Sequence, residues 1–188
     1  MEQVHKDRIR FVQNGDGGKV IAGVDGLVSN KQELALGIKT ADCLPIIFYD
    51  PVARIIGACH AGWRGIAKRL PQKMIDLMIK KGCSPLNILV GIGPFIGGCC
   101  YLVDRARADT FRNIFGNLKR MFWQDKNGYH LELLVPTESQ LLGSGILQNN
   151  IRTGSVCNSC QIDEFFSYRK DSLKTYGEML SIIGFKNS

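Results

Sequence analysis

The sequence predicts a layered α/β (α+β) domain with mixed sheets, because short apolar runs alternate with stretches of helical periodicity. Gly, Asp and Pro turns separate these segments, and the chain contains no internal repeat or low-complexity tract. Its 188 residues, 45% of them hydrophobic, are enough to bury one substantial core. We therefore expect residues 1–188 to form a single domain.

The first half of the chain has the composition of strands. Its apolar runs are rich in Val, Ile and Ala, and Gly- or Asp-containing turns separate them. Several runs are apolar throughout, which is typical of central strands that are covered on both faces. The expected strands are residues 19–24, 33–39, 43–49 and 54–60.

The second half alternates between helices and strands. Apolar residues recur at helical spacing from Ile66 until Gly82, which supplies a stop. Pro71 marks either a late helix start or a kink in this segment. Farther along, we expect strands at 86–92, 151–156 and 179–185 and helices at 103–115 and 131–142.

Charge and composition restrict the classes of partner. The net charge of +7 is spread along the chain, so it favours anionic ligands without identifying one. No nucleic-acid motif surrounds the mixed basic and aromatic residues Lys119, Arg120, Phe122, Trp123 and Lys126. No apolar run is long enough to cross a bilayer, and no leader opens the chain. We expect a cytoplasmic protein with neither a nucleic-acid nor a membrane partner.

The seven cysteines are expected to be mostly reduced, buried thiols, because their number is odd and no secretory signal is present. Cys157 and Cys160 form a Cys-x-x-Cys pair, but a zinc ribbon needs a second such pair and a redox motif needs a particular βαβ context. Cys99 and Cys100 would point to opposite faces of an extended strand. We therefore expect at most one of these two to face a functional site.

His60 is the most informative residue of the chain. It ends an apolar strand and precedes a Gly-rich loop and a helix start, where free backbone N–H groups near Gly65 suit a phosphate. Arg64 adds a planar, bidentate clamp for an anion. The alternative is a core histidine beside an arginine in a surface ion pair. The combination with Trp63 favours function.

Cys43 is expected to lie close to His60, because strands 43–49 and 54–60 can pair as a hairpin through Asp50-Pro51. Two metal-grade donors would then share one rim. Asp42, beside them, can orient a ligand histidine, serve as an acid or base, or cap a turn.

A third donor, His5, completes a set of the kind that binds catalytic zinc. Such sites use three protein ligands and keep a fourth position open, whereas structural zinc closes all four. A histidine so near the end of a chain is more often solvated than liganded, so its assignment depends on the resemblance described next. We rank His130 below His5 and interpret it as structural or peripheral.

Five motifs, in order, resemble the YfiH-type laccase-domain family. This family is also labelled multicopper polyphenol oxidase or peptidoglycan editing factor, and its members are described as purine nucleoside phosphorylases with adenosine deaminase and methylthioadenosine phosphorylase activity. Its fold is an α-β-β-α layered sandwich. The motifs are Glu2-Gln3-Val4-His5, Thr40-Ala41-Asp42-Cys43-Leu44-Pro45, His60-Ala61-Gly62-Trp63-Arg64-Gly65, Gly93-Pro94-Phe95-Ile96-Gly97 with Cys100-Tyr101, and Phe165-Phe166-Ser167-Tyr168-Arg169.

The resemblance implies that His5, Cys43 and His60 bind the metal. It places Asp25 at an acidic position near the site, although a turn aspartate is the plain alternative, and it assigns Arg169 to substrate binding. Family members usually carry several dozen further residues before the Gln-Val-His motif, so we expect this chain to lack the family's N-terminal segment and part of the active-site wall.

The expected function is that of a zinc-dependent purine nucleoside phosphorylase acting on adenosine, inosine and methylthioadenosine, with adenosine deaminase activity. For phosphorolysis, Arg64, Gly65 and the helix start would hold the phosphate that attacks the ribose. For deamination, Asp42 or Asp25 would carry the proton while zinc activates water. The preferred nucleoside, the faster reaction and the oligomeric state stay open.

Three alternatives remain. Cys43 and His60 can form the nucleophile and base of a metal-free hydrolase. Copper can occupy the same donors, but multicopper chemistry needs more imidazoles than the three histidines of this chain. A role in peptidoglycan quality control, without turnover, is the third alternative.

Overall fold

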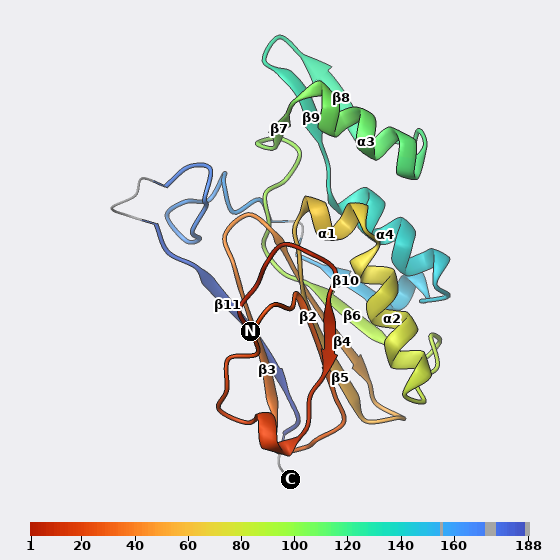
Figure 1. The fold of residues 1–188 in the computed structure, drawn as a ribbon. Coiled ribbons are helices and arrows are strands. Elements are labelled where there is room, and N and C mark those ends of the chain that lie inside the picture. The colour runs from red at the N-terminus through yellow and green to blue at the C-terminus, as the bar shows by residue number, and fades with distance from the viewer. Residues whose placement is uncertain (155, 172–175, 187–188) are drawn as a thin grey trace.

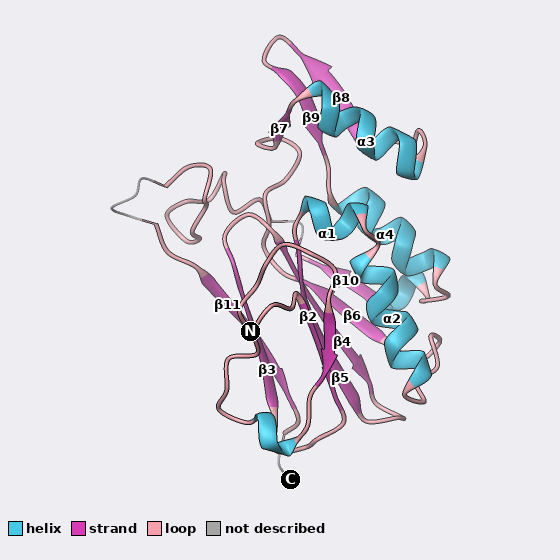
Figure 2. Ribbon diagram, in the orientation of Figure 1, coloured by secondary structure: helices cyan, strands magenta, loops and turns pink. Residues whose placement is uncertain are grey.

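The computed structural model describes residues 1–154, 156–171 and 176–186 and shows a mixed α/β fold (Figures 1 and 2). The strands are β1 (Ile9–Phe11), β2 (Gly26–Ser29), β3 (Ala35–Thr40), β4 (Leu44–Asp50), β5 (Ile55–Ala61), β6 (Leu89–Ile92), β7 (Leu102–Val103), β8 (Phe122–Asp125), β9 (Gly128–Leu131), β10 (Ile151–Thr153) and β11 (Met179–Gly184). The α-helices are α1 (Trp63–Ala67), α2 (Leu70–Lys80), α3 (Arg105–Phe115) and α4 (Leu134–Gly143).

A six-stranded mixed sheet, ordered β1-β2-β5-β4-β6-β10, forms the centre of the fold. Its two outer pairs are parallel and its inner pairs antiparallel. Helices α1, α2 and α4 lie along one face, and the antiparallel pair β3–β11 packs on the other (Figure 2). The predicted mixed α/β class is confirmed. On the outer face of β11, Leu180 and Ile182 are exposed.

Strand β5 separates two apolar cores, because its alternate residues point to opposite faces of the sheet. Cys59 and Ala61 join Met74 of α2 in the core beneath the helices. Ile56 and Ala58 join Ile38 of β3 in the core between the two sheets. The strand is therefore buried on both faces, which explains why it reads as a continuous apolar run.

The predicted hairpin of β4 and β5 is confirmed. Leu44 pairs with Ala61 and Pro45 with His60. The turn is closed by the buried carboxylate of Asp50, which accepts the backbone N–H groups of Val52 and Ala53 at 2.9 Å. This register places Cys43 just beyond the last pair, at the same end of the sheet as His60.

A lobe made of α3 and the three-stranded sheet β7-β9-β8 extends beyond one end of the central sheet (Figure 1). The side chain of Asp104 caps α3 by accepting the N–H of Arg107 at 2.7 Å. Phe111 and Val103 belong to the same core as the helices over the central sheet. The lobe is thereby anchored, and it carries Arg107 toward the end of β5.

Several expected elements differ from the structure. The helix expected from Ile66 is two helices, because Arg69 adopts a left-handed conformation (φ 60°) and Pro71 lies in the first turn of α2. The strand expected at 19–24 is displaced to β2, and the hairpin of β8 and β9 was not expected. Among the described helices, none is long and apolar enough to cross a membrane.

Candidate metal centre and substrate cavity

Three residues that are distant in sequence converge at one end of the central sheet. His5 comes from the N-terminal segment, Cys43 immediately precedes β4, and His60 lies near the end of β5. Their potential ligand atoms all lie within 4.8 Å of one another. The two imidazole rings meet edge to face, with centroids 4.6 Å apart. We call His5, Cys43 and His60 the metal centre.

Gly62 makes room for this convergence. It follows the last paired residue of β5, so it lies across from Cys43. A Cβ atom at this position would come within 2.9 Å of the Cys43 Sγ and 3.3 Å of the His5 ring. Any side chain here would therefore displace two of the three donors.

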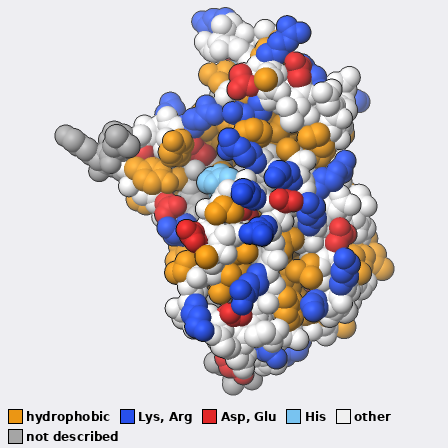
Figure 3. Space-filling view, in the orientation of Figure 1, with side chains coloured by type: hydrophobic (Ala, Val, Ile, Leu, Met, Phe, Trp, Pro, Cys, Tyr) orange, Lys and Arg blue, Asp and Glu red, His pale blue; other side chains and the backbone are white. Residues whose placement is uncertain are grey.

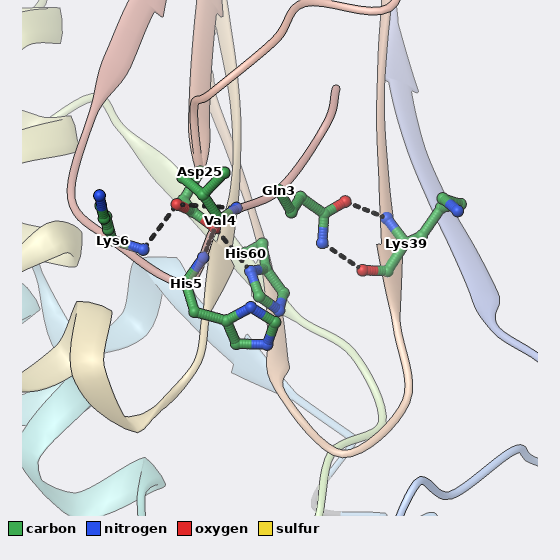
Figure 4. A network of polar contacts seen from close by, with 7 residues as sticks. All are labelled: Gln3, Val4, His5, Lys6, Asp25, Lys39 and His60. Carbon is green, nitrogen blue, oxygen red and sulfur yellow. Dashed lines mark hydrogen bonds and ion pairs between the residues drawn. The ribbon is translucent and has the colours of Figure 1, made fainter.

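Asp25 orients both histidines of the centre (Figure 4). Its fully buried carboxylate lies 2.9 Å from Nδ1 of His60, which leaves Nε2 of that ring as the free ligand atom. The same carboxylate accepts the backbone N–H groups of His5 at 2.9 Å and Lys6 at 2.7 Å. Asp25 is thus the carboxylate that orients His60. The sequence had left this role open for Asp42.

The N-terminal segment is also held by Gln3, whose side-chain amide pairs with the backbone of Lys39 in β3 (Figure 4). The two hydrogen bonds measure 2.6 and 2.9 Å and resemble one rung of a sheet. His5 itself adopts a left-handed conformation (φ 54°), which is uncommon for a residue other than glycine and is maintained by the bonds to Asp25. A segment that would otherwise fray is therefore fixed against the sheet.

The electrostatics of the centre favour a charged thiolate. Burial raises the pKa of Cys43, but hydrogen bonds from His5 and His60 outweigh it and lower the pKa from 9.0 to about 7. Burial lowers the pKa of His60, but its hydrogen bonds with Asp25 and Cys43 outweigh this and raise the pKa to about 9. A metal ion that binds these two residues must therefore release protons.

The donor set fits a catalytic metal ion. Two imidazoles and one thiolate form a mixed nitrogen and sulfur set of the kind that zinc and copper accept, and three ligands leave a position open. The absence of a side chain at Gly62 and the bond from Asp25 to His60 are the features expected around a bound ion. The residues therefore fit a metal ion, and both zinc and copper match this donor set.

Asp42 lies beside the centre, and its carboxylate binds a different loop. Its buried carboxylate accepts hydrogen bonds from the Asn158 side chain at 3.0 Å, the Ser167 hydroxyl at 2.7 Å and the backbone N–H of Arg169 at 2.9 Å. It also has a left-handed backbone (φ 85°). Asp42 thereby joins the start of β4 to the loop before β11.

The metal centre lies in the wall of a cavity of about 950 Å³. Figure 3 shows a histidine surface in a hollow that is rimmed by basic and apolar side chains. The basic side chains that line the cavity are Lys6, Lys39, Arg64, Lys68, Arg107 and Arg169, and the aromatic ones beside the histidines are Trp63, Tyr101, Tyr168 and Tyr176. The cavity therefore offers positive charge and aromatic surface together.

Two arginines meet on Trp63. The guanidinium carbons of Arg64 and Arg107 lie 4.5 and 4.4 Å from the centre of the indole ring. The Nε of Arg107 is buried and has no hydrogen-bond partner among the described residues. Arg107 was not predicted as a site residue, because it lies on α3, more than forty residues along the chain from Trp63. In the sequence, the only sign of Arg107 is the alternation of Arg and Ala at the start of that helix.

Of the other two residues expected to bind substrate, one lines the cavity and one does not. Arg169 lines the cavity and stacks on Tyr101, with 5.0 Å between its guanidinium carbon and the ring centre. Gly65 does not line the cavity: it packs beneath the Lys6 carbonyl, where an added Cβ would come within 3.1 Å. The expected phosphate site on the helix start is weaker than predicted, because α1 has only five residues.

His130 lies apart from the metal centre, as expected for a structural residue. Its ring stacks on Trp123 with centroids 5.0 Å apart, and its Nδ1 lies 2.7 Å from the carbonyl oxygen of Gly98. The chain therefore assembles only two of its three histidines at one site.

Comparisons with known proteins identify a family and related folds. The family described as multi-copper polyphenol oxidoreductase laccase matches residues 1–186. Purine nucleoside phosphorylase YlmD of Geobacillus stearothermophilus is 36% identical over 97% of this chain and 70% of its own length. Adenosine deaminase RL5, from an unknown prokaryotic organism, is 29% identical over 87% of this chain and 63% of its own length. The crystal structure of the hypothetical protein YfiH of Bacillus licheniformis superposes with a TM-score of 0.89 at 38% identity, covering 98% of this chain and 72% of that one.

Proposed function

Because the chain belongs to the multi-copper polyphenol oxidoreductase laccase family, we propose that it is a zinc-dependent purine nucleoside phosphorylase that also deaminates adenosine. The observation that carries this proposal is the position of the metal centre in the wall of a basic and aromatic cavity. A phosphorylase needs one site for an anion and one for a planar base. Both kinds of surface are present beside the centre.

His5, Cys43 and His60 are the proposed ligands of the metal. When bound, zinc supplies Lewis-acid polarisation of a substrate oxygen or nitrogen atom that is placed against it. We favour one zinc ion over several coppers, because the chain brings only two imidazoles to the site and a multicopper centre needs many more.

Arg64 and Arg107 form the proposed phosphate site. Both guanidinium groups lie against the Trp63 ring and both residues line the cavity, so two positive charges stand beside one part of its wall. No described carboxylate forms an ion pair with Arg64, whereas Asp104 accompanies Arg107 at 3.6 Å. Fork-shaped donors from two residues of the cavity lining suit the oxygens of inorganic phosphate.

The purine base is proposed to bind against the tyrosines of the cavity. Tyr168 and Tyr176 meet edge to face with centroids 6.0 Å apart, and Tyr101 forms part of the same wall. Aromatic faces of this kind can stack on a planar base with few polar contacts. The ribose would then lie between the base and the two arginines, next to the metal centre.

Asp25 and Asp42 are proposed to position other groups rather than to carry protons. The carboxylate of Asp25 is fully buried behind His60 and does not line the cavity. Its pKa is lowered, because hydrogen bonds from His60 and Lys6 outweigh the cost of burial. The carboxylate of Asp42 is occupied by three hydrogen bonds from the loop before β11.

A metal-free hydrolase with Cys43 as the nucleophile and His60 as its base is the second candidate. The lowered pKa of Cys43 and the raised pKa of His60 favour it, since they describe a thiolate beside an imidazolium. In this candidate, His5 would only add a hydrogen bond to the Cys43 thiolate. Removal of metal by a chelator distinguishes the two candidates, because a dyad would keep its activity.

The decisive experiment measures adenosine, inosine and methylthioadenosine consumption with and without phosphate, together with the metal content of the protein. We expect base and ribose 1-phosphate only when phosphate is present, and inosine formed from adenosine in its absence. Loss of both activities on chelation, and their return with zinc, would support the proposal. Full activity in metal-free protein would reject it. Turnover by this chain would also support our proposal that residues 1–188 act as one domain.

A further inference from the structure

Four cysteines meet outside the metal centre. Cys99 and Cys100 lie in a turn before β7, and Cys157 and Cys160 lie in the loop that follows β10. We call these four residues the thiol cluster. The expectation that Cys99 and Cys100 point apart is wrong, because the chain turns at this place instead of running as a strand. The missing second pair for Cys157 and Cys160 is thus supplied by a distant loop.

The spacing of the sulfur atoms is that of a metal site rather than of disulfides. The Sγ atom of Cys160 lies 3.5 Å from that of Cys99 and 3.4 Å from that of Cys100, and these two are 4.0 Å apart. All four sulfur atoms lie within 4.8 Å of one another. A tetrahedral zinc ion with Zn–S bonds of about 2.3 Å separates its sulfur ligands by about 3.8 Å. A disulfide requires about 2.05 Å.

The backbone around the thiol cluster is arranged for thiolates. The N–H of Gly97 donates to the Sγ of Cys157 at 3.3 Å, a bond that stabilises negative charge on sulfur. An added Cβ at Gly97 would approach both Cys99 and Cys157 to 3.3 Å, so the loop has no room for a side chain. Backbone hydrogen bonds from Phe95 to Val156 and from Asn158 to Phe95 align the two loops.

We propose that the thiol cluster binds one zinc ion through all four cysteines as a closed, structural site. Four thiolates in tetrahedral reach favour zinc or an iron–sulfur cluster, and one ion fits the short sulfur separations. Because four protein ligands leave no open position, this site holds structure and takes no substrate. It is chemically distinct from the three-ligand metal centre.

The zinc ion would hold a wall of the cavity in place. Asn158 lies between the two cysteines of its loop, and its side-chain amide donates to Asp42 at 3.0 Å and to the Phe166 carbonyl at 2.7 Å. Asp42 in turn accepts the N–H of Arg169, which lines the cavity. The thiol cluster therefore connects, through Asn158, to Asp42, the residue that precedes Cys43.

Metal analysis of the purified full chain tests this proposal. We expect about two zinc ions per chain in the unaltered protein, and about one in Cys160→Ser and in Cys99→Ser. Both cysteines are exposed, so these substitutions leave the core intact. Cys83→Ala, which alters a buried cysteine outside both sites, is the matched control and should keep both ions. His5→Ala should lose the other ion and keep that of the thiol cluster.

Cobalt substitution provides an optical readout that does not depend on counting metal ions. Cobalt at four thiolates should give the intense visible bands of a tetrahedral thiolate site, and these bands should persist in His5→Ala and vanish in Cys160→Ser. Equal metal content in Cys160→Ser and the unaltered protein would overturn the proposal. Disulfides among the four cysteines, found by mass spectrometry after alkylation without reductant, would also overturn it, as would iron with acid-labile sulfide.

Discussion

Nδ1 of His60 lies 2.9 Å from the carboxylate of Asp25, which also accepts the backbone N–H of His5. One buried side chain therefore sets the ring of one proposed ligand and the chain position of another. This relationship joins residues 5, 25 and 60 into a unit whose parts cannot be adjusted separately. It makes Asp25 the first residue at which to test the metal centre.

Asp25→Asn should weaken metal binding by about 10- to 100-fold, because an amide orients the His60 ring less firmly and accepts fewer of the hydrogen bonds that position His5 and Lys6. Competitive titration of the metal-free protein with a chromogenic chelator measures this change. Asp76→Asn, at an exposed position of α2, is the control and should bind metal normally. Unchanged affinity in Asp25→Asn would contradict the assigned role.

Gly62→Ala should reduce metal content and activity together, since the new methyl group would come within 2.9 Å of the Cys43 sulfur. Metal analysis and nucleoside turnover of the same preparation provide the two readouts. Gly143→Ala is the matched substitution, because an added Cβ there meets nothing within 4 Å and lies in a helix. A fully metallated Gly62→Ala protein would show that the donors have more room than the structure gives them.

Arg64→Ala and Arg107→Ala should each raise the KM for phosphate by about tenfold or more, the effect of losing a charge-assisted hydrogen bond. Deamination of adenosine, which consumes water and no phosphate, should change much less. Arg105→Ala, two residues from Arg107 on the exposed side of α3, controls for the loss of a positive charge. Equal losses in both reactions would argue that the arginines shape the cavity and do not select phosphate.

Loading of the metal centre should depend steeply on pH. Binding requires the thiolate of Cys43, whose pKa is about 7, and neutral His60, whose pKa is about 9. Protons therefore compete with the metal below these values, and the apparent affinity should rise by about tenfold per pH unit through neutrality for each proton released. Above about pH 9 this competition ends and the affinity should level off. The difference between metal titrations of the unaltered protein and of His5→Ala isolates this centre. A metal affinity that falls as the pH rises would contradict the pKa shifts.

The parts of the site that follow from local rules were predictable. The apolar runs on either side of Asp50-Pro51 indicated a hairpin, and antiparallel pairing through that turn brings Cys43 and His60 to one end. The position of Arg64 at the cavity was expected from its place at the helix start that follows His60 and the Gly-rich loop. In contrast, the break at Arg69 depends on how α1 and α2 pack, and periodicity alone joined them into one helix.

The cysteines show the opposite case. The sequence does not predict this cluster, because no second pair stands at the usual spacing from Cys157 and Cys160 and because Cys99 and Cys100 are expected to point apart on a strand. Their meeting depends on the turn after Gly97 and on the bridge between Phe95 and Cys157. Arg107 was missed for the same reason, since it reaches Trp63 from a separate lobe.

By itself, the sequence determined the donor types, the hairpin that joins two of them and the family to which the chain belongs. Tertiary structure alone decided which carboxylate orients His60, which arginines meet at Trp63 and which cysteines cluster. The physical reason is range. Periodicity and turn chemistry act between neighbours along the chain, whereas these contacts join loops whose positions depend on the packing of the whole sheet.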